Sequence, residues 1–341
     1  MRSDMPSKST GGAPKPADGL LPHFFLTGPR HSGTTLVSSI LCEDPKLFTI
    51  VDSLVHPLFL RLNEKMRRLK DNRFAEIHTV SSFTEPVSLD QAKWYLSILT
   101  DAYFSVGTNE TLIKNMSRYS IYGNMLDFEA ILQAARQGTN WKEFFGIILN
   151  QLIPEEKNRN KLEMVGEKMP ANIKHLNLLS REYPDRKFIV LVRHPLDNVA
   201  SIYARLLHAQ KTLPKERENN RISAVLIESL ETYLEYANKL LDPLLKSDQF
   251  LILRFEDFLD APDQYIQCIH HFLGLSSPQR FKGQFNPFLM EEFVGHSIDK
   301  DRSTSKRKFF TEAETQIVVP NIKHIARFYS RISTRPAMKT A

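Results

Sequence analysis

Cysteine is scarce in this chain of 341 residues, where Cys42 and Cys268 are the only two. Two cysteines provide no disulfide framework, and no paired Cys/His spacing indicates a zinc site. We therefore expect no metal.

Long apolar runs are also missing. Runs such as residues 188–192 fall far short of the ~20 residues that a membrane-spanning helix needs. The opening twenty residues contain Gly, Pro, Ser and Lys but no apolar stretch, which is typical of a flexible tail rather than a secretory signal. We expect a chain without a transmembrane segment that works in the cytoplasm.

Neither sign of charge dominates, since 45 Lys and Arg stand against 39 Asp and Glu, for a net charge of +6. This balance favours anionic ligands, but it lacks the dense basic stripes of a nucleic-acid binder. We expect a phosphorylated small molecule as ligand and no nucleic-acid partner.

Short apolar runs predict the fold. Residues 23–27 enter a Gly-containing turn, and residues 34–41 can then be helical, so this stretch predicts strand, loop and helix. Residues 187–192 and 250–254 are typical of buried parallel strands, because each is short, apolar and bounded by polar residues. The prediction is an α/β fold with a P-loop-like central parallel sheet flanked by helices.

The pattern becomes helical between about residue 55 and residue 165. This region predicts a helical insertion between a second strand at 47–51 and the segment around Lys168. Its expected helices cover residues 88–104, 127–136 and 141–152. We expect flexible tails at 1–20 and 331–341, with a single domain at 21–330.

A glycine-containing loop carries the first functional motif, Gly28-Pro29-Arg30-His31-Ser32-Gly33-Thr34-Thr35. It follows a predicted strand and opens a helix, which is the setting in which backbone N–H groups bind a phosphate. The spacing equals that of a nucleotide kinase, but Thr34 replaces the lysine that should follow the second glycine. A P-loop kinase or ATPase is weakened but stays an alternative, as does a turn without a ligand.

A second motif follows the strand at 187–192. Arg193 ends that strand, and Ser201 comes eight residues later, about two turns along a helix that starts near Pro195. Both side chains can therefore face one phosphate near the strand end. A purely structural role for the pair is the competing interpretation.

Together the two motifs resemble the sulfotransferases that use 3′-phosphoadenylyl sulfate (PAPS), most closely the tyrosylprotein and carbohydrate sulfotransferase branch, over about residues 24–310. The resemblance implies that the first motif binds the 5′-phosphosulfate and that the second binds the 3′-phosphate. It also implies a cofactor-contacting Arg205, an adenine contact from Tyr233, and a late loop that closes over the cofactor. The implied cofactor-binding residues are Arg30, His31, Ser32, Gly33, Thr34, Thr35, Arg193, Ser201, Arg205, Tyr233, Arg302, Ser303 and Thr304.

The same resemblance implies the catalytic residues. Glu167-Lys168-Met169-Pro170 is similar to the Lys-x-Pro segment of that branch, in which the lysine contacts the sulfuryl group or the bridging oxygen. A glutamate base follows the first helix in the tyrosylprotein branch, and Asp52 stands at that position here, with His56 as a neighbour that could share the role. The implied reaction moves a sulfuryl group from PAPS to an acceptor hydroxyl and releases adenosine 3′,5′-bisphosphate (PAP).

One departure from the family concerns the first motif. The family usually has Arg or Lys directly before Ser-Gly-Thr, where this chain has His31 preceded by Arg30. Either Arg30 supplies the cation, or His31 contacts the phosphosulfate as a donor. The departure also keeps open a non-catalytic nucleotide-binding protein on the same fold.

The acceptor is expected to bind against the helical middle, where no motif is decisive. The lack of a membrane anchor in the sequence favours a small-molecule, lipid or glycan hydroxyl. We leave open whether the chain forms a homodimer.

Overall fold

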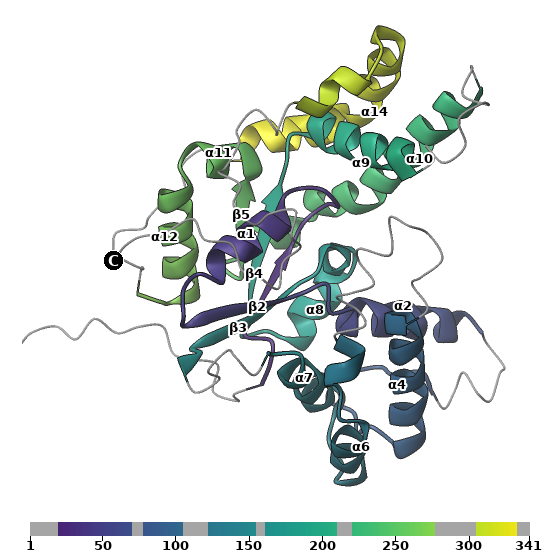
Figure 1. Ribbon diagram of the computed structural model, residues 1–341, viewed down its shortest axis with the longest axis vertical. Coiled ribbons are helices and arrows are strands. Elements are labelled where there is room, and N and C mark those ends of the chain that lie inside the picture. The colour runs from purple at the N-terminus through teal and green to yellow at the C-terminus, as the bar shows by residue number, and fades with distance from the viewer. Residues whose placement is uncertain are drawn as a thin grey trace, which may run out of the picture.

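A five-stranded parallel sheet forms the centre of the protein in a computed structural model that describes residues 20–69, 78–104, 122–154, 161–209, 220–276 and 305–332. The strand order is β2-β3-β1-β4-β5, and every neighbouring pair is parallel (Figure 1). The α/β fold with a central parallel sheet is thus confirmed. The strands are β1 Phe24–Thr27, β2 Leu47–Val51, β3 Met164–Lys168, β4 Lys187–Val192 and β5 Phe250–Arg254.

Alternate residues of the strands enter two separate cores, because successive side chains of a strand point to opposite faces of a sheet. Phe24 and Leu26 of β1 join the core on one face, whereas Phe25 joins the core on the other. The first face is covered by α1 Thr34–Leu41, α11 Phe255–Asp260 and α12 Pro262–Leu273.

The opposite face carries the larger core. Its helices are α2 Val55–Arg68, α4 Leu89–Phe104, α6 Phe128–Arg136, α7 Trp141–Gln151, α8 Leu176–Glu182, α9 Pro195–Ala209, α10 Asn220–Ala237 and α14 Glu312–Arg331. In Figure 1, α2, α4, α6 and α7 gather at the lower right, while α9, α10 and α14 lie together at the upper right. Short 3₁₀ helices complete the described chain: η2 Pro170–His175, η3 Asn238–Leu241, η4 Pro243–Lys246 and η6 Ser305–Phe309.

The region between β2 and β3 is helical, as the sequence pattern indicates. Polar residues define where its helices begin. Asp127 accepts a hydrogen bond from the N–H of Ala130 at the start of α6, and Asn140 forms a reciprocal capping box with Glu143 at the start of α7. These caps satisfy N–H groups that a helix leaves without an internal partner.

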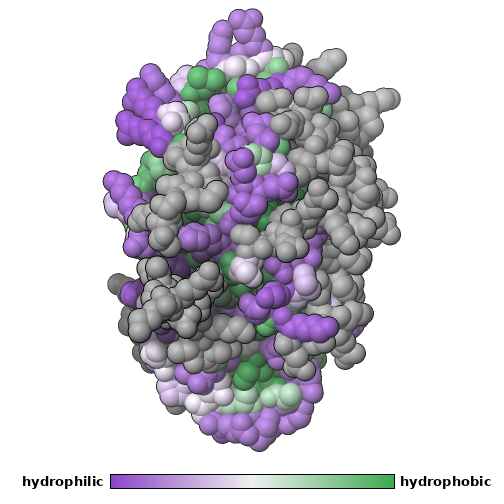
Figure 2. Space-filling view, turned by 90° about the vertical axis from the view of Figure 1, so that its left-hand side faces the viewer, coloured by the Kyte–Doolittle hydropathy of each residue, from purple (hydrophilic) through white to green (hydrophobic). Residues whose placement is uncertain are grey.

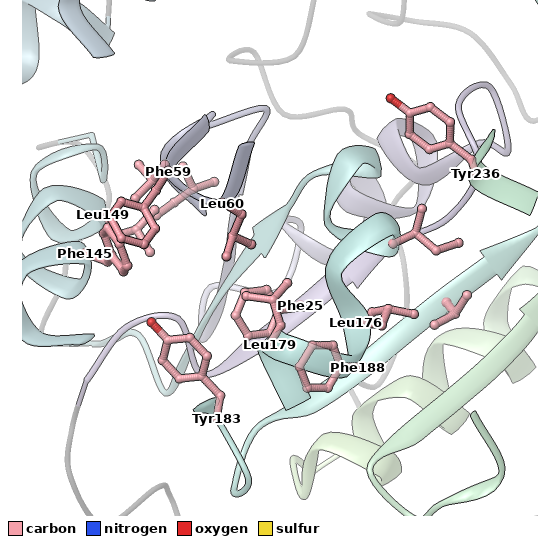
Figure 3. Packing of buried hydrophobic residues seen from close by; sticks show 14 of the residues in the cluster. Phe25, Phe59, Leu60, Phe145, Leu149, Leu176, Leu179, Tyr183, Phe188 and Tyr236 are labelled. Carbon is pink, nitrogen blue, oxygen red and sulfur yellow. The ribbon is translucent and has the colours of Figure 1, made fainter. Parts of the chain in front are cut away.

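Aromatic rings fill the core between this insertion and the sheet. The ring of Phe59 on α2 lies 4.4 Å from that of Trp141 and 5.0 Å from that of Phe145, both on α7. Figure 3 shows Phe59 and Phe145 on the insertion side, with Phe25 and Tyr183 nearer the sheet. The insertion is therefore fixed to the sheet by close packing.

The described surface is mostly hydrophilic on the face that Figure 2 displays, and its apolar residues form small separate patches. Large apolar side chains that are more than a third exposed occur singly or in pairs: Leu69, Ile227, Leu241, Phe309, Ile317 and Val319. Within the described residues no helix is both long and apolar enough to cross a membrane.

Strand β3 was not predicted as a strand, because Gly166, Glu167 and Lys168 interrupt any apolar pattern. All five of its residues are nevertheless buried. A Cβ atom added to Gly166 would lie 2.3 Å from the ring of Phe24 on the neighbouring strand, so only glycine fits there.

Gly166→Ala should therefore destabilise the protein, by about 1–3 kcal/mol, because the added methyl group overpacks the contact between β1 and β3. Urea unfolding would measure the loss. The matched control is Gly146→Ala on α7, where an added Cβ would lie 3.4 Å from Leu21, in ordinary contact. This control should be neutral or slightly stabilising, and an equal loss in both variants would contradict the explanation.

Candidate active site

The carboxyl ends of four neighbouring strands meet at one edge of the sheet, which is where open α/β sheets bind their ligands. Strand β1 leads into the loop at Gly28, β2 into Asp52, and β4 into Arg193, while β3 ends on Lys168. The fold therefore brings together segments that are far apart in the sequence.

Two glycines shape the loop at residues 28–35, which we call the phosphate loop. A Cβ atom on Gly28 would lie 2.2 Å from the carbonyl oxygen of Leu191 in β4. Gly33 adopts φ 92° at the N-cap of α1, and a Cβ there would lie 2.2 Å from the ring of Phe255. Only glycine allows this close approach and this dihedral angle.

The phosphate loop fits an anionic group. The hydroxyl of Ser32 is buried and has no hydrogen-bond partner within the described residues. Gly33 has no side chain to cap the first N–H groups of α1, and the positive end of a helix favours an anion. A buried hydroxyl beside a helix N-terminus matches a sulfate or phosphate ligand.

His31 lies among cations. Its pKa is lowered to about 3, chiefly by burial and then by the charges of Arg205, Arg30, Arg193 and Lys168, in that order. The imidazole keeps some exposed surface, but the surrounding protein atoms and positive charges disfavour its protonation. Near neutral pH His31 is therefore a neutral hydrogen-bonding group and contributes no positive charge.

Arg30 lies near the aromatic ring of Tyr236. Its side chain is exposed, and its guanidinium carbon lies 5.5 Å from the centre of the Tyr236 ring. The ammonium group of Lys174 lies 4.2 Å from the same ring. Arg30 is thus a cation held at the border of the site by a cation–π contact.

Arg193 lies beneath the phosphate loop. Its Nη1 donates a hydrogen bond to the carbonyl oxygen of His31 at 3.2 Å, and its guanidinium carbon is 5.6 Å from the centre of the Phe255 ring. Burial lowers its pKa, and the charges of Asp197 and Glu256 act in the opposite direction. Ser201 lies farther along α9 and is partly exposed, and Arg205, one turn beyond, is exposed.

An ion pair anchors the start of α9. Arg307 in η6 donates through Nε and Nη2 to the two carboxylate oxygens of the buried Asp197, the second bond measuring 2.7 Å. Two further basic residues, Lys306 and Lys308, flank Arg307 in η6. Arg307 forms this bidentate pair, whereas Lys306 and Lys308 lie over the ring of Phe309.

Tyr233 on α10 and Asn198 on α9 add buried polar groups to this region. The Tyr233 hydroxyl and both amide atoms of the Asn198 side chain are buried and have no hydrogen-bond partner within the described residues. Burial raises the pKa of Tyr233, with a smaller contribution from the charge of Glu256, so its hydroxyl keeps its proton. Unsatisfied buried amides and hydroxyls are rare, and a bound ligand, water or ion can supply the missing partner.

Asp52 and Lys168 form the most direct contact of the site. Lys168 Nζ donates to Asp52 Oδ1 at 2.9 Å, and the N–H of Asp52 donates to the carbonyl oxygen of Lys168 at 2.8 Å. The Lys168 side chain is 2% exposed and that of Asp52 26%, so the carboxylate is the member that solvent and an acceptor can reach.

Backbone strain is concentrated at these residues. Among the described residues, three that are not glycine adopt a positive φ: His31 at 64°, Asp52 at 55° and Leu54 at 62°. Such conformations cost free energy and persist where surrounding contacts fix them, often at functional sites. All three belong to the phosphate loop or to the turn after β2.

His56 does not face the site. It is fully buried, its Nδ1 lies 2.9 Å from Glu167 Oε2, and its Nε2 lies 2.9 Å from the hydroxyl of Tyr183. Because both ring nitrogens are engaged in the core, His56 is not placed to share the role of a base.

Arg302, Ser303 and Thr304 lie outside the described residues. Sequence reasoning missed the pairing of Glu167 with His56, that of Arg307 with Asp197, and the buried Asn198. The local signal for Asn198 was its position inside the motif, three residues before Ser201, whereas the two pairings join segments that only the fold brings together.

Among the described residues, no group of three or more His, Cys, Asp and Glu is placed to hold a metal ion.

Comparison with known proteins identifies the class. The sequence profile described as the sulfotransferase family matches residues 22–279. The chain belongs to the sulfotransferase family, and family membership implies PAPS as co-substrate. The resemblance inferred from the motifs is confirmed at the level of the family, while the tyrosylprotein and carbohydrate branch stays a prediction.

Individual relatives are distant. The chain is similar to the omega-hydroxy-beta-dihydromenaquinone-9 sulfotransferase Stf3 of Mycobacterium bovis and of Mycobacterium tuberculosis, with 21% identity over 287 residues, or 79% of this chain and 67% of each relative. A solved sulfotransferase domain from the Synechococcus PCC 7002 olefin synthase shares 17% identity, with a TM-score of 0.47, over 93% of this chain and 98% of that one. The sulfotransferase domain from the curacin biosynthetic pathway shares 16% identity, with a TM-score of 0.46, over 89% of this chain and 99% of that one.

The lowered pKa of His31 predicts acid sensitivity. The unfolded chain binds a proton at this imidazole near pH 6.5, whereas the folded protein does so only near pH 3. The free energy of unfolding should therefore fall as the pH drops from about 6.5 towards 3.

His31→Asn should weaken this pH dependence, as measured by urea midpoints across that range. His271→Asn, at an exposed position of α12, is the matched control and should keep the wild-type slope. If His31→Asn were as acid-sensitive as the wild type, the imidazole would not be the group that titrates.

Proposed function

We propose that Asp52 and Lys168 carry out the transfer of the sulfuryl group from PAPS to an acceptor hydroxyl. The 2.9 Å contact between Lys168 Nζ and Asp52 Oδ1, at the sheet edge that also holds the phosphate loop, carries this proposal. A base and a cation placed side by side suit a reaction in which one oxygen loses a proton and another gains negative charge.

The roles follow from exposure and charge. Asp52, the more exposed partner, accepts the proton of the acceptor hydroxyl as that oxygen attacks sulfur. Lys168, almost fully buried, stabilises negative charge on the oxygen that sulfur leaves. Bound PAPS supplies the activated sulfuryl group, and the overall reaction forms one oxygen–sulfur bond, breaks another and releases PAP.

The remaining residues hold and orient the cofactor. The phosphate loop, with the Ser32 hydroxyl and the first N–H groups of α1, suits the 5′-phosphosulfate, and His31 adds a neutral donor. Arg193, Ser201 and Arg205 follow β4 and suit the 3′-phosphate. We include Tyr233 and Asn198 because their buried polar atoms match the edge of an adenosine.

We propose a small molecule, a lipid or a glycan as the acceptor, with transfer that needs no metal. The Mycobacterium relatives are named for a hydroxylated menaquinone, which supports the lipid option. Location in the cytoplasm stays a prediction from the sequence, and whether the chain forms a homodimer stays open.

The sequence and the site argue against the two alternatives, a P-loop kinase or ATPase and a non-catalytic nucleotide-binding protein. No residue beside Gly33 supplies the lysine of a kinase loop, and the matched family transfers sulfuryl groups. A non-catalytic binding protein would have no need for Asp52 in a strained turn beside Lys168, yet both features are present.

Arg193→Ala should weaken PAP binding about 10- to 100-fold, because charge-assisted hydrogen bonds to a phosphate are worth about 1.5–3 kcal/mol. Calorimetric titration with PAP would measure the change. Arg136→Ala, at an exposed site on α6, is the matched control and should bind PAP like the wild type. Equal affinity for PAP in the wild type and in Arg193→Ala would show that the Arg193 guanidinium does not bind the 3′-phosphate.

Asp52→Asn and Lys168→Ala should each lower turnover about 100-fold or more, since a positioned base or charge stabiliser typically contributes that much. PAP release from PAPS would be measured with a panel of a hydroxylated quinol lipid, a phenol and a glycoside. Asp52→Asn should keep wild-type affinity for PAP. Near-normal turnover in both variants would refute the mechanism.

A further inference from the structure

The turn that carries Asp52 is conformationally costly. Asp52 and Leu54 both adopt a positive φ, at 55° and 62°, although neither is a glycine. Each such residue costs on the order of 1–3 kcal/mol and needs surrounding contacts to hold it. The turn, which we define as residues 51–55, therefore depends on the contacts that hold Asp52 and Leu54 in these conformations.

A buried carboxylate supplies the first of these contacts. Glu167 Oε1 accepts a hydrogen bond from the hydroxyl of Ser53, the residue after Asp52, and the same hydroxyl accepts one from the N–H of Val55 at 3.2 Å. The Ser53 side chain thus joins both halves of the turn to Glu167.

Glu167 is itself fixed from several sides. Its Oε2 accepts from His56 Nδ1 at 2.9 Å and from Asn172 Nδ2 in η2 at 2.8 Å. Burial acts to raise the pKa of Glu167, but the charge and hydrogen bond of His56, together with the hydrogen bonds of Ser53 and Asn172, lower it below its ordinary value. The group therefore remains a carboxylate that accepts from all three neighbours.

Aromatic rings enclose the hydrogen-bonded pair of Glu167 and His56. The rings of Phe25, Phe83, Phe145 and Tyr183 lie between 5.0 and 6.3 Å from that of His56. Figure 3 shows Phe25 and Tyr183 near the sheet, with Phe145 facing them from the insertion. This close packing restricts the side chains of Glu167 and His56 to a single arrangement.

The insertion holds the two ends of the turn. The hydroxyl of Tyr122 donates to the carbonyl oxygen of Val51 at 2.8 Å, and that of Tyr95 on α4 donates to the carbonyl oxygen of Val55 at 2.6 Å. The turn is thus hydrogen-bonded at its start, its middle and its end.

Strand β3 connects these contacts to Lys168. Successive side chains of a strand point to opposite faces, so Lys168 reaches Asp52 from one face while Glu167 reaches Ser53 from the other. One dipeptide of β3 therefore contacts two adjacent residues of the turn.

We propose that Glu167 is a positioning residue, which acts through Ser53 to hold the Asp52 turn against Lys168. It touches neither cofactor nor acceptor, and the catalytic part of this inference rests on the proposed function of Asp52. The hydrogen bond from His56 and the two tyrosine hydroxyls act with it.

The test removes one hydroxyl, in Ser53→Ala, which leaves the buried hydrogen bond between Glu167 and His56 intact. Hydrogen exchange of the Asp52 N–H, which donates to the carbonyl oxygen of Lys168, reports whether the turn remains in place. Exchange should accelerate about 10-fold or more. Ser229→Ala is the control, because this buried hydroxyl donates within α10, to the carbonyl oxygen of Val225, and its loss should leave Asp52 protected.

Turnover measured by PAP release forms the second arm. Ser53→Ala should lower turnover about 10-fold or more while PAP affinity stays within twofold of the wild type. In an Asp52→Asn background the same change should cost nothing further, because the two residues act as one unit. Glu167→Gln should reproduce both effects.

Unchanged exchange at Asp52 in Ser53→Ala would overturn the positioning role. Faster exchange with wild-type turnover, or an equal loss of turnover in both backgrounds, would overturn its catalytic consequence. A wild-type protein that releases no PAP would count against the proposed function instead, while hydrogen exchange would still decide whether Glu167 holds the turn.

Discussion

Main-chain hydrogen bonds of β3 to both β1 and β2 determine where the site forms. The N–H of Met169 donates to Leu26 at the end of β1, and the N–H of Asp52 donates to Lys168 at the end of β3. Asp52 and Lys168 are 116 residues apart along the chain, yet this pairing leaves their side chains in contact. The whole helical insertion between them must fold back onto the sheet for the contact to exist.

Electrostatics around the phosphate loop follow from the same geometry. Arg205, Arg30, Arg193 and Lys168 come from four different segments, and all act on His31. Like charges gathered in one place repel, and an incoming anion relieves that repulsion. A neutral histidine in the position where the family usually has Arg or Lys lowers this repulsion without removing a hydrogen-bonding group.

Much of this arrangement was predictable from local patterns. Strands β1, β4 and β5 are short apolar runs, and the phosphate loop, Arg193 and Lys168 lie in recognisable motifs. Strand β3 escaped prediction because its Gly166 and Glu167 are buried by partners that no local pattern reveals. The Glu167–His56 pair, which joins positions 111 residues apart, is likewise a product of the sheet order. Sequence patterns identify ligand-binding residues that lie in a local motif. They miss residues whose role depends on contacts with distant segments across the core.

The placement of the two tryptophans has a practical consequence. Trp94 and Trp141 are the only tryptophans of the chain, and both belong to the insertion. Trp141 packs against Phe59, one turn of α2 beyond His56, while Trp94 stacks near His78 at 4.5 Å. The tryptophan fluorescence of the protein therefore originates on the side of the sheet opposite α1, and it reports changes in the packing around the buried Trp141. The chain thus carries its own optical reporter for the half of the molecule where the acceptor is expected to bind.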